Sequence, residues 1–243
     1  MNYPLELTEQ EAALAARQLL RREDVGTLIT LNHSGTKNPG GHIPPHSQEE
    51  KELEGFPFGI VEYYVDLKGE RGNPVLFISK LQKSFVNFKF DNRVALTIRA
   101  NFDKGTVMTN ARVTLQGSLE PLSEDKIEEA QNAFVEAHHD AKWWIHFKDF
   151  EFYQLKVQRV YWVGGFGGSH YIGYVNPEWY SDVSESHLLA DTFSSLFACK
   201  SQTKTKILFL TLILALLFLI ALLILNFTIQ RKSHSLLVQD LKL

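Results

Sequence analysis

Residues 74–100 read Pro74-Val-Leu-Phe-Ile-Ser-Lys-Leu-Gln-Lys-Ser-Phe-Val-Asn-Phe-Lys-Phe-Asp-Asn-Arg-Val-Ala-Leu-Thr-Ile-Arg-Ala100, and this stretch decides the predicted fold. Two short apolar runs, residues 75–78 and 94–98, are rich in β-branched and aromatic residues and have the length of strands. Between them, apolar residues recur at helical spacing over residues 81–88. The pattern therefore predicts a strand, a short amphipathic helix and a second strand.

The start of this predicted helix is a candidate anion site. Ser79 precedes the helix as a possible N-cap, and Lys80, Lys83 and Ser84 lie in its first turns. Backbone N–H groups at a helix start favour negative charge, and hydroxyl and ammonium groups add donors. The segment predicts a site for a phosphate-bearing ligand.

Composition bounds the class of protein. The chain has 243 residues, is 44% hydrophobic and carries a formal net charge of −3. These values are typical of a globular domain and argue against a nucleic-acid partner. Nine histidines are scattered along the chain and there is one cysteine, so the spacing predicts neither a metal site nor a disulfide framework.

The order of the remaining elements favours a small closed β-barrel over a parallel α/β sheet, because strands outnumber helices and turn signals separate them. A capping box of Thr8 and Glu11 begins the first helix, residues 32–57 form a long loop, and a break in alternation near Arg159 predicts a bulge in the last long strand. The predicted strands are 27–31, 60–67, 75–78, 94–98, 111–119 and 150–163, and the predicted helices are 12–22, 81–88, 123–138 and 177–180.

The C-terminal part has a different character. Residues 207–229 contain no charged side chain and predict one transmembrane helix. Residues 183–206 are a polar linker before it, and residues 230–243 are a short tail. The N-terminus lacks the pattern of a signal peptide. We therefore expect a tail-anchored, single-pass membrane protein with its barrel in the cytosol, most simply at the endoplasmic reticulum, so that the sequon at Asn32 is not glycosylated.

Several motifs together resemble a known family. Residues 78–88, 115–118, 139–143, 161–168 and 176–180 resemble, in order, the split-barrel domain of the CREG family. The same order of elements is similar to the wider pyridoxamine-phosphate-oxidase-like flavin family and its haem-utilisation branch. The resemblance spans roughly residues 10–182, about one domain of chain, within a predicted domain of residues 1–182.

The resemblance implies an FMN-binding split barrel that forms a homodimer with two ligand sites at the subunit interface. In flavin-binding members the segment that matches Ser79, Lys80, Lys83 and Ser84 holds the flavin phosphate. Arg112 matches a polar strand residue that meets the flavin.

Three functions follow. The first is a membrane-anchored, FMN-dependent oxidoreductase, with His170 as the candidate catalytic residue. The second is a non-catalytic CREG-type dimer that has lost flavin binding and binds a partner protein. The third is a haem-binding protein whose axial ligand is a histidine; the candidates are His138, His139, His146 and His170.

Overall fold

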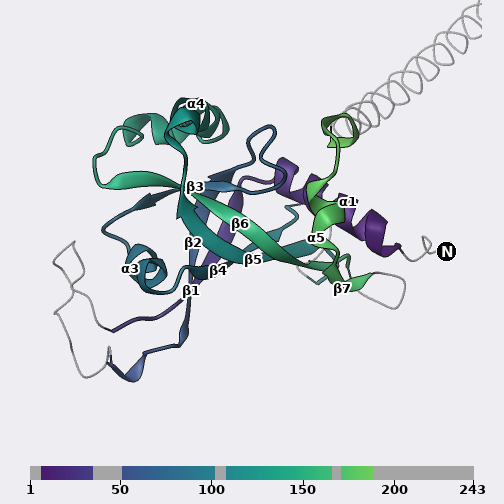
Figure 1. Cartoon of the computed structure of the whole chain (residues 1–243), viewed down its shortest axis with the longest axis horizontal. Helices are drawn as coiled ribbons and strands as arrows, with labels where there is room; N and C mark the ends of the chain where they lie inside the picture. Colours follow the sequence, from purple (N-terminus) through teal and green to yellow (C-terminus); the bar gives the residue numbers. More distant parts are fainter. Residues whose placement is uncertain (1–6, 35–50, 102–107, 166–170, 189–243) are drawn as a thin grey trace, which may run out of the picture. The chain divides into compact units, whose positions relative to one another are not determined.

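Six antiparallel strands close into a barrel in the computed structural model of the chain (Figure 1). Their order is β3-β2-β1-β4-β5-β6, β3 pairs with β6 to complete the ring, and β7 extends the sheet from β6. The closed barrel with helices predicted from the sequence is confirmed. The strands are β1 (Val25–Leu31), β2 (Pro57–Val65), β3 (Val75–Ser79), β4 (Arg93–Arg99), β5 (Arg112–Pro121), β6 (Phe150–Val163) and β7 (Ile172–Val175).

The structure describes residues 7–34, 51–101, 108–165 and 171–188. Within these ranges no helix has both the length and the apolar character needed to cross a membrane. The predicted span at residues 207–229, its linker beyond residue 188 and the tail lie outside the described residues, and so does His170.

The helices lie around the barrel, with α1 and α5 near one end of the view in Figure 1 and α3 and α4 toward the other. Thr8 and Glu11 form the predicted capping box at the start of α1. The α-helices are α1 (Glu9–Arg22), α3 (Lys83–Phe90), α4 (Ile127–Ala137) and α5 (Pro177–Ser181), and the 3₁₀ helices are η1 (Glu124–Lys126) and η2 (His139–Trp143).

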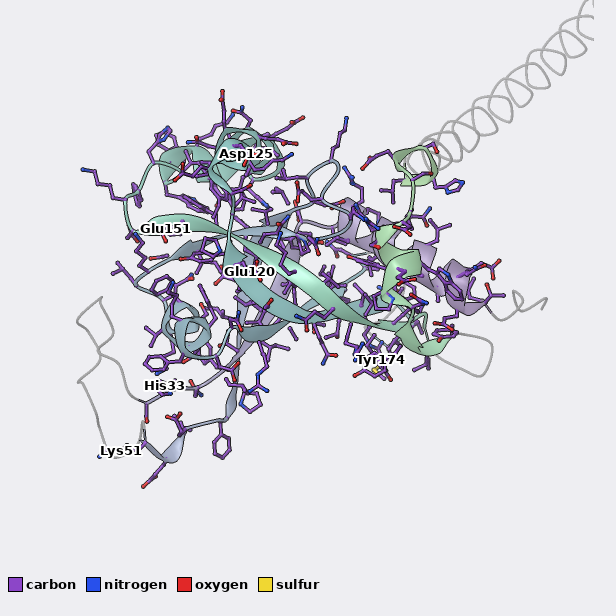
Figure 2. All side chains as sticks on the ribbon, viewed as in Figure 1. His33, Lys51, Glu120, Asp125, Glu151 and Tyr174 are labelled. Carbon is purple, nitrogen blue, oxygen red and sulfur yellow. The ribbon has the colours of Figure 1, made fainter. Side chains whose placement is uncertain are left out.

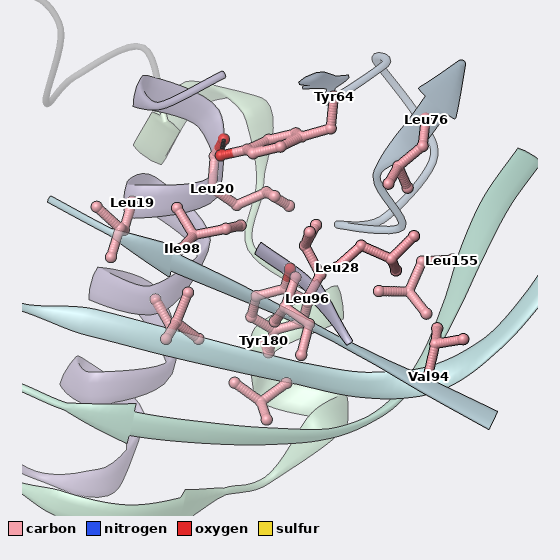
Figure 3. Close-up of a cluster of buried hydrophobic side chains, with 14 of the residues drawn as sticks. Leu19, Leu20, Leu28, Tyr64, Leu76, Val94, Leu96, Ile98, Leu155 and Tyr180 are labelled. Carbon is pink, nitrogen blue, oxygen red and sulfur yellow. Dashed lines mark hydrogen bonds between the residues drawn. The ribbon is translucent and has the colours of Figure 1, made fainter. Parts of the chain in front are cut away.

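Two hydrophobic clusters lie on opposite faces of β2 and β3. Tyr64 and Leu76 point into the barrel, where they join side chains of α1, β1, β4 and β5 (Figure 3). Their sequence neighbours Val65 and Phe77 belong to a second cluster beneath α4. Because side chains alternate across a strand, both faces are packed along β3 and at the end of β2, at Tyr64 and Val65.

The predicted break in β6 is a β-bulge. Gln116 pairs with Arg159 and Gly117 pairs with Val157, so Gln158 is the extra residue. A Cβ on Gly117 would lie 1.9 Å from the carbonyl oxygen of Lys156. Only glycine fits this close approach between β5 and the bulge.

The predicted helix start at Ser79 is wrong. Ser79 ends β3, and α3 begins at Lys83 with Gln82 as N-cap. The backbone N–H of Lys80 donates to the carbonyl of Asp149 at 2.7 Å, which extends the contact between the chain after β3 and the segment before β6. This contact holds residues 79–82 in a turn, so the helix starts two residues later than the apolar spacing predicts.

Candidate functional site

The turn between β3 and α3 carries the four residues predicted to hold a phosphate. Ser79 is almost fully buried, and its hydroxyl donates to Oδ2 of Asp149 at 2.6 Å. The same hydroxyl accepts the N–H of Leu81 at 3.1 Å. Ser79 therefore stabilises the turn rather than a helix N-terminus.

The other three predicted residues also have partners within the protein. Lys80 Nζ lies 2.6 Å from Oε1 of Glu151, which is labelled in Figure 2. Lys83 Nζ donates to the carbonyl oxygen of His33 at 3.0 Å. Ser84 is fully buried, and its hydroxyl lies 3.5 Å from Oε1 of Gln82.

The charges of this turn do not fit a phosphate. The hydrogen bond from Lys80 lowers the pKa of Glu151, which is therefore ionised at neutral pH. The side chain of Asp149 accepts a hydrogen bond from the Ser79 hydroxyl. A phosphate dianion here would have to displace Glu151 from Lys80 and approach both carboxylates, and like charges at such distances repel. The residues present are thus a poor fit to the phosphate of FMN.

Arg112 lies far from this turn in the same protomer. Ser79 pairs with Phe150 at the start of β6, whereas Arg112 pairs with Val163 at its end. At 3.2–3.4 Å per strand residue the two ends of β6 are up to roughly 40 Å apart. The structure does not bring Arg112 and the β3–α3 turn together in one barrel; only an Arg112 from a second copy could face the same ligand.

The candidate haem ligands differ in accessibility. His138 is buried, its Nε2 lies 3.1 Å from the carbonyl oxygen of Tyr64, and its ring stacks on Tyr63 with 4.0 Å between centroids. Its contacts make it a packing residue. His139 is exposed.

His146 has the more suitable surroundings for a ligand. It is exposed and borders a cavity of about 450 Å³ that is also lined by Phe77, Ile145 and Phe147. Its Nδ1 lies 3.2 Å from the side-chain amide of Gln131. Within the described residues no group of three or more His, Cys, Asp or Glu side chains is placed to hold a metal ion.

A second cavity opens where β2 and β3 separate. The two strands pair only at Tyr64–Leu76 and Val65–Val75. Beyond these pairs they diverge, and the space next to the split has a volume of about 480 Å³. We call it the split pocket. Its lining residues are Val61, Glu62, Tyr63, Phe77, Gln82, Trp144, Phe147 and Phe150.

Glu62 is the charged group of the split pocket. The residue is only 9% exposed, and its Oε1 is buried with no hydrogen-bond partner among the described residues. Burial raises the pKa of Glu62 to about 7, and a hydrogen bond with the Gln82 side chain offsets part of the rise. A carboxyl group that changes charge near neutral pH is often functional.

Sequence reasoning did not identify Glu62, Asp149 or Glu151. Glu62 occupies a polar position in an alternating strand, where a solvated side chain is expected. Glu62 shares its face of β2 with Ile60 and Tyr64, which pack in the barrel core, and no local pattern reports that this face is the inner one. Asp149 and Glu151 lie about 70 residues after Ser79 and Lys80, which they contact.

Solved structures with similar folds include a haem-binding protein. A haem-binding protein from Mycobacterium smegmatis is 30% identical, with a TM-score of 0.56; the match covers 70% of this chain and 60% of that protein, so this chain spans less than two thirds of its length. A protein of unknown function from Agrobacterium tumefaciens is 21% identical, with a TM-score of 0.49 and coverage of 77% and 64%. The haem storage protein of Vibrio cholerae is 12% identical, with a TM-score of 0.45 and coverage of 61% and 93%.

The last two TM-scores are too low to support an inference about ligands. Among curated proteins, no sequence matches this chain. The model of the CREG β-barrel family matches residues 7–182, which include every strand and all but the end of the described residues. The closed six-stranded barrel agrees with that match. This chain belongs to the CREG β-barrel family.

Proposed function

We propose that this chain is a non-catalytic CREG-type split barrel, a dimeric binding module tethered to a membrane by residues 207–229. The proposal rests on the contacts that the four residues of the β3–α3 turn make within the protein. Ser79, Lys80, Lys83 and Ser84 are each engaged by a protein group, and the carboxylates of Asp149 and Glu151 are among those groups. The turn thus stabilises the barrel instead of presenting donors to a phosphate.

An FMN titration tests this proposal. The full chain in mild detergent should leave FMN fluorescence unchanged, because bound flavin would have to bring its phosphate beside two carboxylates. Replacing both carboxylates, as Asp149→Asn with Glu151→Gln, should create measurable FMN affinity, because it leaves Lys80 without its anionic partner. A yellow protein with one tightly bound FMN per chain would contradict the proposal.

Matched controls separate charge removal at the turn from general effects of net charge. Glu120→Gln with Asp125→Asn removes the same two charges at exposed positions elsewhere on the barrel (Figure 2). This control should not gain FMN affinity. If both double variants gain it equally, the carboxylates of the turn are not what opposes the phosphate.

Haem binding is a second candidate, and His146 is the observation that favours it. Histidine ligands of metals usually donate their second ring N–H to an acceptor. Nε2 of Gln131 lies 3.2 Å from Nδ1 of His146, and exchanging the amide oxygen and nitrogen of Gln131 would place an acceptor there. This arrangement would leave Nε2 of His146 available to bind the iron of a haem. The haem itself would supply the redox chemistry. Phe77, Ile145 and Phe147 in the wall of the cavity beside His146 would pack on a planar macrocycle. The 30% identical structure is that of a haem-binding protein.

A haem titration decides between the candidates. A haem-binding protein should develop a Soret band at one haem per chain, His146→Ala should abolish it, and His139→Ala should leave it unchanged. Glu124 and Glu151 also line the cavity and would oppose the haem propionates. We therefore rank haem binding second. A stoichiometric Soret band that depends on His146 would place haem binding first.

A further inference from the structure

The split pocket combines an acidic group with aromatic walls. Glu62 lines it from β2, and Gln82 lines it from the turn before α3. Phe77, Trp144 and Phe150 form a continuous aromatic surface, with ring centroids 5.7 Å apart for Phe77–Trp144 and 5.2 Å apart for Trp144–Phe150. Phe147, which is 55% exposed, completes the wall at the opening.

The carboxyl group of Glu62 lacks a partner that its charged form needs. Burying a carboxylate is costly unless donors or an opposite charge compensate for the lost water. The described structure supplies Gln82 and leaves Oε1 without a hydrogen bond. A cationic donor at this position would satisfy Oε1 and stabilise the ionised form.

The aromatic walls select for the same charge. Aromatic faces carry negative partial charge and attract cations, and their rings stack on the ring of a flat ligand. At about 480 Å³ the pocket has the volume of a small-molecule site. A neutral ring would gain the stacking alone, and a carboxylate ligand would be repelled by Glu62.

We propose that the split pocket binds a small aromatic ligand that carries a protonated amine. The aromatic ring of the ligand stacks between Trp144 and Phe147, and its ammonium group donates to the Glu62 carboxylate. The split pocket shares Phe77, Phe147 and Phe150 with the His146 cavity, and Gln82 belongs to the β3–α3 turn. Glu62 does not line the His146 cavity, so the effect of Glu62→Gln on tryptamine binding tests this inference separately from the proposed function.

Calorimetry with three matched indoles tests the proposal on the full chain in mild detergent. The probes are tryptamine, with an ammonium group; tryptophol, with a hydroxyl; and indole-3-propionate, with a carboxylate. We expect saturable binding of tryptamine, about tenfold weaker binding of tryptophol because a charge-assisted hydrogen bond is lost, and no binding of indole-3-propionate.

Three variants assign the binding to this pocket. Glu62→Gln should weaken tryptamine binding about tenfold and abolish the preference over tryptophol. Phe147→Ala removes a half-exposed ring, so it should leave the fold intact and weaken both ligands several-fold. Glu120→Gln, an exposed acid on β5, should change neither affinity.

The proposal is overturned by any of three results. These are equal binding of tryptamine and tryptophol, unchanged tryptamine binding by Glu62→Gln, or no saturable binding of tryptamine to the native chain. If Glu62→Gln fails to fold, judged by circular dichroism, the Phe147→Ala variant and the order of the three ligands decide the question alone.

Discussion

Glu62 links protonation to stability at the scale of a single residue. Its pKa in the folded chain is about 7, against an ordinary value of 4.5, because burial disfavours the charged form. Between these two pH values the folded chain holds a proton that the unfolded chain has released. The contribution of Glu62 to stability is therefore fully present below pH 4.5 and is lost as the pH rises to about 7.

The Glu62→Gln variant should remove this pH dependence. The free energy of unfolding of the native chain should fall by about 3 kcal/mol between pH 4.5 and pH 7 through Glu62 alone, since one pKa unit corresponds to 1.36 kcal/mol. Urea unfolding measures the free energy of unfolding of both proteins at each pH. The difference between the native chain and the variant gives the contribution of Glu62. Glu120→Gln is the control. Parallel profiles for the native chain and Glu62→Gln would show that Glu62 is not protonated in the folded state.

A buried ion cluster fixes α1 to the barrel at the scale of elements. Arg17 of α1 and Asp66, just after β2, each have side chains only 2% exposed, and their charged atoms lie 2.5 Å apart. Arg21 lies 2.7 Å from the same carboxylate. Removing one partner of such a group leaves an uncompensated buried charge. The ion cluster and the buried apolar face of α1 together hold the helix against the barrel.

The bulge in β6 gives the sharpest test of an element. Gly117→Ala should lower the free energy of unfolding by about 3 kcal/mol, because its Cβ would overlap the carbonyl of Lys156 on a backbone that cannot move aside without breaking the β5–β6 ladder. Gly59→Ala is the matched control, since its Cβ would meet Thr27 at an ordinary 3.4 Å. Denaturant unfolding measures both. Equal effects of the two variants would mean that the bulge is not rigid.

The bulge and the helix start of α3 show what sequence patterns can predict. A bulge can be read directly from the sequence, because the extra residue reverses which face the following side chains point to. The break in alternation near Arg159 marks the bulge in this way. The beginning of α3 depends instead on the contact between Lys80 and Asp149. That contact joins residues far apart in sequence, so periodicity within residues 81–88 could not reveal it.

The candidate site shows the same division. The residue types at positions 79–84 predict a phosphate site, because hydroxyl and ammonium groups at a helix start suit an anion. Whether those groups are available depends on what the rest of the fold places beside them. Asp149 and Glu151 reach the turn only because β6 closes the barrel against β3. Sequence motifs can thus indicate the family. Whether the residues of a motif are available to a ligand depends on which side chains the closed barrel places beside them.

At the scale of the whole molecule, the outer face of the barrel suits contact with a second copy. Alternation places Leu28 and Leu96 inside, so Thr27, Ile29 and Ala95 lie outside. A Cβ on Gly59 would touch Thr27 and Ile29, which confirms that these residues share one face. Val61 is 64% exposed nearby on β2. An extended face of small and apolar side chains is typical of an interface.

The predicted homodimer can be tested on this face. The full chain in mild detergent should have twice the mass of its 27.8 kDa protomer by light scattering, after correction for detergent. Ile29→Glu should shift it to one protomer, because a symmetric interface would bury two carboxylates opposite each other. Met108→Glu, at another exposed apolar residue, should leave the mass unchanged. A native chain that is monomeric across the accessible concentrations would exclude the dimer, and it would leave Arg112 unable to share a ligand with the β3–α3 turn.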